Sequence, residues 1–313
     1  MAVVALTGAS GFIGGHLAAA LLHEGHQVRA LARSPNAKLS RTGVHIVQGS
    51  LDDEASLADL LRGAEVVVHA AGVVQAPCHA AYRQVNVNGT ARLARLAAER
   101  DSRHFLFISS LAARQPRLSR YAESKAMAET AVLRFSDRLA LTIVRPPAVY
   151  GPGDRRILPV IDRLSRGWLL APAETAARFS LLFVSDLIEL ILALLAPTAP
   201  RHVVLEPDDG RVNGYAWRDL ATIAEASLGR RVRVVGLGRG PLLALASVLE
   251  GYSRVHGRLS PLWRDKVKEL FYADWVSDTR SLAIVPAWRP MTELGLGLQS
   301  TLSWYRSAGW LQR

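Results

Sequence analysis

A chain of 313 residues, half of them hydrophobic and 21% charged, is long enough to bury a large core and too apolar to be disordered. Its single cysteine, Cys78, excludes a disulfide framework and a thiolate metal cage, so we predict no metal site. The net charge of +11 could attract nucleic acid, but the densest basic stretches, 114–120 and 254–268, lack interleaved aromatic side chains, and we expect no nucleic-acid partner. The longest apolar stretch, 187–196, is too short for a transmembrane segment, and without an export signal we expect a cytoplasmic protein.

Apolar runs typical of strands alternate with helical stretches along the first two thirds of the chain. We predict strands at 3–7, 28–32, 45–48, 66–70, 105–109, 141–145 and 202–205, with helices between most of them. This alternation predicts an α/β fold with a doubly wound parallel sheet of the Rossmann type, because parallel strands need crossover connections. The pattern changes after Tyr150, where a loop and a helical segment at 157–167 follow. We therefore predict two lobes.

The first predicted lobe, a dinucleotide-binding Rossmann domain, comprises residues 1–151 and approximately 182–209. The second, a smaller C-terminal substrate lobe, comprises approximately 152–181 and 210–313. We see no internal repeat and no low-complexity linker between them. The smaller lobe is therefore expected to consist of insertions and the C-terminal region.

A glycine-rich turn, TGASGFIG at residues 7–14, joins the first predicted strand to a helix at 12–23. Glycines let the backbone turn tightly and approach a pyrophosphate, and the positive end of the following helix attracts the anion. The strand before the turn and the helix after it supply the context that such a motif needs. We assign Gly8, Ser10, Gly11, Phe12, Ile13 and Gly14 to cofactor binding.

Three further residues carry the chemistry that the sequence suggests. Tyr121 and Lys125 stand four residues apart in an alanine-rich helical segment, so both project from one face. A nearby ammonium lowers the pKa of a phenol from its ordinary value of about 10, which suits a proton donor or acceptor for a carbonyl or alcohol oxygen. Ser110, at the end of a predicted strand, can hydrogen-bond the same oxygen. We predict Ser110, Tyr121 and Lys125 to be catalytic.

Together these segments resemble the extended short-chain dehydrogenase/reductases, also called the NAD-dependent epimerase/dehydratase family. The resemblance rests on residues 7–14, 68–72, 86–90, 107–110, 121 with 125, and 145–153, and covers nearly the whole chain. It implies a Ser/Tyr/Lys mechanism in which Lys125 also holds the nicotinamide ribose. Hydride would pass between the nicotinamide and a substrate carbon. The resemblance also implies a homodimer formed through two long helices, one of which carries Tyr121.

The cofactor preference depends on where the chain departs from the family pattern. Beyond the glycine turn we assign to the cofactor Arg33, Ser34, Lys38, Ser50, Leu51, Ala70, Ala71, Gly72, Asn86, Tyr121, Lys125, Pro146 and Val149. NAD-using members carry an acidic residue where this chain has Arg33, and an arginine favours a ribose 2′-phosphate. We therefore expect NADP(H), with NAD(H) as the alternative and with stacking of Arg33 on adenine as the other interpretation. Ser50 replaces a usual carboxylate, and we interpret Asp52 and Asp53 as caps of the next helix.

The reaction type is narrowed by what surrounds the catalytic residues. The stretch 111–120 contains no carboxylate for a second proton transfer, which weighs against elimination. Pro147 and Ala148 stand where nucleotide-sugar enzymes tend to have an asparagine. We predict an NAD(P)-dependent oxidoreductase that interconverts a carbonyl and an alcohol on a small, lipophilic substrate. The alternatives are an NAD-dependent nucleotide-sugar epimerase with retained cofactor, and a non-catalytic NADP(H)-sensing scaffold.

One apolar helical stretch, 240–249, falls in the predicted substrate lobe. An apolar helical face is usually buried, and we expect this one to pack against the rest of that lobe. The alternatives are that it lines a lipophilic pocket or lies on a membrane surface with the basic residues that follow it.

Overall fold

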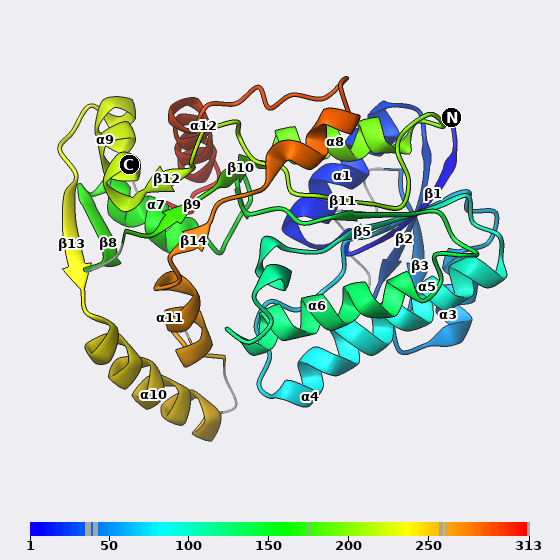
Figure 1. Ribbon diagram of the computed structural model, residues 1–313, viewed down its shortest axis with the longest axis horizontal. Helices are drawn as coiled ribbons and strands as arrows, with labels where there is room; N and C mark the ends of the chain where they lie inside the picture. The colour runs from blue at the N-terminus through cyan, green and yellow to red at the C-terminus, as the bar shows by residue number, and fades with distance from the viewer. Residues whose placement is uncertain (35–38, 40–42, 174–175, 257–258, 261, 312–313) are drawn as a thin grey trace. The chain divides into compact units, whose positions relative to one another are not determined.

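The computed structural model describes residues 1–34, 39, 43–173, 176–256, 259–260 and 262–311 (Figure 1). The chain forms two compact units. Unit 1 comprises residues 1–146, 188–206 and 279–288, and unit 2 comprises 147–187, 207–278 and 289–313. The predicted lobes placed the whole of 210–313 in the smaller one, whereas the structure includes 279–288 in unit 1, where a 3-10 helix (η3, Thr279–Ile284) packs on strand β11 (Val203–Leu205).

Unit 1 is built on a seven-stranded parallel sheet with the strand order β11-β6-β5-β4-β1-β2-β3. Its other strands are β1 (Val3–Thr7), β2 (Gln27–Ala32), β3 (His45–Gln48), β4 (Val66–His69), β5 (His104–Ile108) and β6 (Leu141–Val144). Its helices are α1 (Phe12–His23), α3 (Glu54–Leu60), α4 (His79–Tyr82), the π-helical η1 (Arg83–Gly89), α5 (Thr90–Glu99), the 3-10 helix η2 (Leu111–Arg114) and α6 (Arg120–Leu133). The predicted doubly wound Rossmann-type sheet is confirmed, with strand ends shifted by at most one residue.

The core of unit 1 explains why these segments form strands. All residues of β4, β5 and β6 are buried, as expected for central parallel strands covered on both faces. Helices α3, α5 and α6 cover one face, and α1 with α8 (Val184–Leu195) lies on the other (Figure 1). Leu57, Leu93 and Val132 from the first layer pack with Phe105 and Ile143 of the sheet.

Unit 2 combines short strands with helices around a second core. Its strands are β7 (Ala148–Tyr150), β8 (Trp168–Pro172), β9 (Arg178–Phe179), β10 (Leu181–Phe183), β12 (Tyr215–Ala216), β13 (Arg233–Leu237) and β14 (Asp274–Trp275). Its helices are α7 (Leu158–Ser165), α9 (Trp217–Leu228), α10 (Arg239–Val255), α11 (Arg264–Leu270) and α12 (Leu294–Ser307). The core includes Tyr150, Leu220, Leu298 and Tyr305. None of the described helices in either unit is long and apolar enough to cross a membrane.

Helix α10 contains the apolar stretch 240–249, which we expected to be buried. The expectation is wrong for one side of the helix. Ala246 is fully buried, but the side chains of Leu245 and Val248 are 49% and 69% exposed. Among the described elements, the main packing partner of α10 is the short helix α11.

Candidate active site

The glycine-rich turn between β1 and α1 is close-packed where the sequence has glycine. Gly8 has a φ of +80°, and a Cβ on it would lie 2.7 Å from the carbonyl carbon of Ala70. A Cβ on Gly14 would lie 2.1 Å from the carbonyl oxygen of Gly8, so neither position can carry a side chain without moving backbone. The N-cap residue of α1, Gly11, supplies no side-chain acceptor to the first turn. The first turn of α1 therefore has no side-chain cap from its N-cap residue, and such a helix end can bind an anion through its backbone amides.

The sheet topology places this turn at the point where strand order reverses. Strands β2 and β3 lie on one side of β1, whereas β4, the next strand along the chain, lies on its other side. In open parallel sheets, ligands bind outside the carboxyl ends of the strands at such a switch point. The residues that follow β1 and β4, Gly8 and Ala70 to Gly72, lie there. Among the described residues no cluster could hold a metal ion.

A chain of buried hydrogen bonds joins these two strand ends. Thr90 Oγ1 donates to the carbonyl oxygen of Asn86 (2.6 Å), so it must accept from His69 Nε2 (2.8 Å). The other ring nitrogen, Nδ1, then accepts from Thr7 Oγ1 (2.6 Å), which itself accepts from the amide of Ala71 (3.2 Å). Complete burial lowers the pKa of His69 to about 3, with a smaller effect of the Lys125 charge. His69 is therefore a neutral structural linker with one defined tautomer.

Asn86 extends this network to the helix that carries the predicted acid. Its Oδ1 accepts from the amide of Val73 (2.8 Å), and its Nδ2 donates to the carbonyl of Val73 and to Ser124 Oγ (both 2.9 Å). Ser124 Oγ in turn donates to the carbonyl oxygen of Tyr121 (2.7 Å). The buried Asn86 side chain thus fixes the loop after β4 against α6. The sequence assigned Asn86 to the cofactor; the structure shows these protein contacts.

The three predicted catalytic residues lie at the carboxyl end of β5 and on the first turns of α6. Ser110 follows β5, is half-buried, and caps η2 by accepting from the amide of Ala112 (3.2 Å). Tyr121 is half-buried on the first turn of α6, which begins where Ser119 accepts from the amide of Ala122. One turn further, the buried Lys125 Nζ donates to the carbonyl oxygen of Ile108 (2.9 Å). That bond ties α6 to the strand end that precedes Ser110.

Lys125 is held in an apolar environment. Its ammonium lies 4.3 Å from the ring centroid of Phe107, and burial lowers its pKa to about 7, an effect that the charge of Glu129 partly opposes. A lysine with this pKa titrates near neutral pH, whereas an exposed lysine titrates at a higher pH.

One turn after Lys125 on α6, an ion-pair network ties the helix to the sheet. Glu129, which is 4% exposed, accepts from Arg145 Nη2 (2.6 Å) and Nε (3.0 Å) and from the hydroxyl of Ser109. Arg145 also pairs with Glu206 (3.3 Å), which has a second partner in Arg114 (3.4 Å). These residues follow β5, β6 and β11, so the network joins three strand ends to one helix.

The next predicted cofactor residues follow strands β2 and β3. Arg33 and Ser34 follow β2 and are exposed, and Lys38 lies outside the described residues. Ser50 and Leu51 follow β3 in a turn in which Ser50 Oγ accepts from the amide of Asp52 (3.2 Å).

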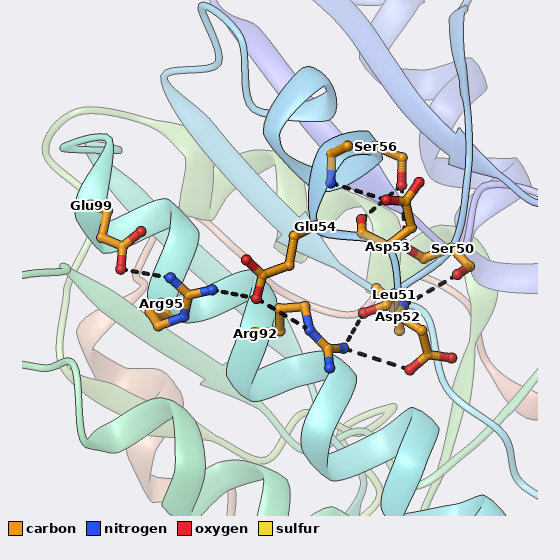
Figure 2. A network of polar contacts seen from close by, with 10 residues as sticks. Ser50, Leu51, Asp52, Asp53, Glu54, Ser56, Arg92, Arg95 and Glu99 are labelled. Atoms are coloured by element: carbon orange, nitrogen blue, oxygen red, sulfur yellow. Dashed lines mark hydrogen bonds and ion pairs between the residues drawn. The ribbon is translucent and has the colours of Figure 1, made fainter.

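The contacts around this turn, drawn in Figure 2, show that the capping prediction was half correct. Asp53 is the N-cap of α3 and accepts from the amide of Ala55 (3.0 Å). Asp52 instead pairs with Arg92 (3.6 Å), which also donates to the carbonyl oxygen of Leu51.

The predicted cofactor residues therefore have a common location in unit 1. Almost all of them follow the carboxyl ends of its strands or lie on α1, η1 and α6; they are Gly8, Ser10, Gly11, Phe12, Ile13, Gly14, Arg33, Ser34, Ser50, Leu51, Ala70, Ala71, Gly72, Asn86, Tyr121, Lys125 and Pro146. Pro146 accepts from the amide of Leu111, next to Ser110 (2.9 Å). Val149 lies on β7 in unit 2. The glycine turn and the uncapped α1 fit a dinucleotide.

Comparison with known proteins agrees with this arrangement. The model of the NAD dependent epimerase/dehydratase family matches residues 4–205, which is more than half of the chain. The chain belongs to this family. It is an NAD(P)-dependent oxidoreductase of the extended short-chain dehydrogenase/reductase type.

Relatives within this family include both reductases and epimerases. A ceramide reductase of Caulobacter vibrioides is 36% identical, over 99% of this chain and 96% of the relative. A 3 beta-hydroxysteroid dehydrogenase/Delta 5-->4-isomerase of Mycobacterium tuberculosis is 26% identical, over 87% and 81%. Among solved structures, a UDP-glucuronic acid 4-epimerase of Bacillus cereus in complex with NAD shares the fold, with a TM-score of 0.75 and 17% identity over 98% of this chain and 99% of that one.

Sequence reasoning missed the residues that hold the site together. His69 ends an otherwise apolar strand, and Glu129 follows Lys125 by four residues on α6. Both residues could have been found from the sequence, because a histidine at the end of a buried strand and a carboxylate on the buried side of a helix each need a hydrogen-bonding or charged partner.

Proposed function

We propose that this protein is an NADP(H)-preferring carbonyl reductase for a lipophilic substrate of the ceramide kind. The observation that carries the proposal is the near full-length similarity to a ceramide reductase. The predicted catalytic residues, Ser110, Tyr121 and Lys125, lie on two segments that one buried hydrogen bond ties together. Lys125 on α6 donates to the carbonyl oxygen of Ile108, two residues before Ser110, which supports an intact acid/base site. A cytoplasmic location and a homodimer through α5 and α6 remain part of the proposal.

Each catalytic residue has a role that follows from its chemistry and position. When bound, the nicotinamide supplies the hydride. Tyr121 donates its phenolic proton to the carbonyl oxygen as that oxygen gains charge, and Ser110 Oγ donates a hydrogen bond that orients the same oxygen. The Lys125 ammonium stabilises the phenolate that remains and bonds the ribose. Because Lys125 is bonded to the carbonyl of Ile108, its position is fixed before substrate enters.

The proposed preference for NADP(H) rests on Arg33. This residue is exposed directly after β2, the strand next to the glycine turn, where a guanidinium can pair with a 2′-phosphate. Replacing Arg33 by Asp should therefore weaken NADPH binding and leave NADH binding unchanged or improved. Equal loss of both cofactors would show instead that Arg33 stacks on adenine.

The proposal is tested with purified protein in a detergent-dispersed assay. NADPH oxidation is followed with a ceramide that carries a ketone, for wild type, Tyr121→Phe and the matched control Tyr272→Phe, whose tyrosine lies in unit 2. We expect Tyr121→Phe to lower kcat by about 10²–10⁴-fold while NADPH affinity and the control remain unchanged. Wild-type protein that binds NADPH but reduces no carbonyl lipid, or a Tyr121→Phe variant with full activity, would refute the reductase assignment.

An epimerase is the second candidate, and the solved epimerases of the same fold favour it. An epimerase recycles its cofactor between two half-reactions, so the purified protein should retain NAD. Mass analysis of the material released on denaturation separates the two functions: retained NAD supports the epimerase, and exchangeable NADPH supports the reductase. The scaffold alternative predicts NADPH binding without turnover.

A further inference from the structure

Helix α10 presents a continuous apolar strip to its outside. The side chains of Leu245, Val248, Tyr252 and Val255 are 49%, 69%, 63% and 83% exposed. They are spaced by three or four residues, so they lie along one side of the helix. We call these four side chains the α10 strip. Tyr252 adds an aromatic ring, which stacks on the ring of His256 at a centroid distance of 4.0 Å.

The other side of α10 attaches the helix to unit 2. Ala246 and Ser253, which point away from the strip, are buried. The main packing partner of α10 is α11, which lies beside it in Figure 1. The helix is therefore held by one side and leaves the strip uncovered. Exposed apolar side chains gathered on one surface are a feature of interaction sites.

The charge around the strip indicates what it contacts. Residues 239–269, which include α10 and nearly all of α11, contain six Lys or Arg and three Asp or Glu, a net charge of +3. Arg239, the first residue of α10, and Arg264, the first residue of α11, are both exposed. Apolar and aromatic side chains on one side of a helix, in a segment of net positive charge, are features of helices that lie in the interface of an anionic bilayer.

We propose that the α10 strip docks on an anionic lipid bilayer, with its side chains at the boundary between headgroups and acyl chains. The exposed Arg239 and Arg264 would contact lipid phosphates. A second copy of the chain fits this surface less well, because a two-fold contact would bring the same positively charged segment of both copies together. The docking does not depend on the proposed reductase activity, although it would give such an enzyme access to a membrane-resident substrate.

The test is sedimentation of the full-length protein with vesicles. Vesicles of phosphatidylcholine alone are compared with equimolar phosphatidylcholine and phosphatidylglycerol, for wild type, Val248→Asp and the matched control Val212→Asp. Val212 is 84% exposed on a loop of unit 2, outside α10, so the control makes the same chemical change on another surface. We expect wild type and the control to bind the anionic vesicles, and Val248→Asp to lose about tenfold in partitioning.

Electrostatic docking also predicts that added salt weakens binding and that pure phosphatidylcholine binds less. Equal binding of Val248→Asp and the control, or no binding of wild type to anionic vesicles, would overturn the proposal. So would a wild-type dimer in light scattering that Val248→Asp converts to a monomer, because the strip would then be a subunit interface. Unchanged circular dichroism and NADPH affinity show that the variants are folded. Loss of reductase activity without loss of vesicle binding would contradict the proposed function and leave the docking intact.

Discussion

The buried Glu129 provides the sharpest test of how the site is held together. Glu129→Gln preserves the shape of the side chain but removes the charge that faces Arg145, whose Nη2 and Nε lie 2.6 and 3.0 Å from the carboxylate. Breaking a fully buried ion pair costs about 3–5 kcal/mol. Arg145 keeps a second partner, Glu206 at 3.3 Å, and its side chain is 23% exposed, so we expect a loss of about 2 kcal/mol in the free energy of unfolding.

Urea unfolding followed by circular dichroism measures this loss, which corresponds to a decrease in Tm of about 4–8 °C for a unit of this size. The matched control is Glu99→Gln, because Glu99 pairs with Arg95 at 2.8 Å on the surface, where both side chains are more than a third exposed. We expect the control to change stability by less than about 0.5 kcal/mol. A double variant, Glu129→Gln with Arg145→Gln, should lose less than the sum of the single losses. Equal effects of the two Glu→Gln changes, or strict additivity, would refute the reasoning.

Three further predictions concern the glycine turn, the linker and the buried lysine. Gly14→Ala should abolish NADPH binding in fluorescence titration, because its Cβ would lie 2.1 Å from the carbonyl oxygen of Gly8. The control Gly15→Ala, whose Cβ would lie 3.5 Å from its nearest neighbour, should bind NADPH normally. Equal NADPH binding by both variants would contradict the role of close packing at Gly14. His69→Leu should lower the free energy of unfolding by about 2–3 kcal/mol, because the buried hydroxyls of Thr7 and Thr90 each lose one of their two hydrogen bonds. A neutral result in urea unfolding would show that water replaces the ring. Lys125 has a pKa of about 7 in the folded protein and an ordinary value of 10.5. Between these values the unfolded chain binds a proton that the folded chain lacks, so the free energy of unfolding rises with pH. Lys125→Met should flatten this rise in urea unfolding measured from pH 7 to 10, and an unchanged slope would show that another group titrates.

The sequence predicted unit 1 well because its signals are local and strong. The strands are continuous apolar runs, and the turn at 7–14 requires glycine at Gly8 and Gly14, so both are readable without coordinates. Asp53 caps α3 as expected because N-capping depends on the next two residues only. Asp52 was assigned wrongly because its partner, Arg92, is distant in the chain.

The elements of unit 2 were harder to predict from the sequence, because their local signals are weaker. Strands β9, β12 and β14 have two residues each, too few to show an alternating pattern, and their pairing joins segments far apart in the chain. For the apolar stretch of α10 the sequence favoured burial and left exposure on a membrane surface as an alternative, since an apolar helical face looks alike in sequence whether another layer covers it or not. The polar network from Thr7 to Asn86 likewise depends on which strands become neighbours.

The division of the chain between the two units has a consequence for its synthesis. The chain passes between the units five times, and strand β11, which covers the outer edge of β6, is separated from it by a stretch that includes residues 147–187 of unit 2. While the ribosome is still making that stretch, β6 is an open sheet edge able to pair with another nascent chain. The protein should therefore depend on chaperones most strongly in the interval between emergence of residue 144 and residue 203.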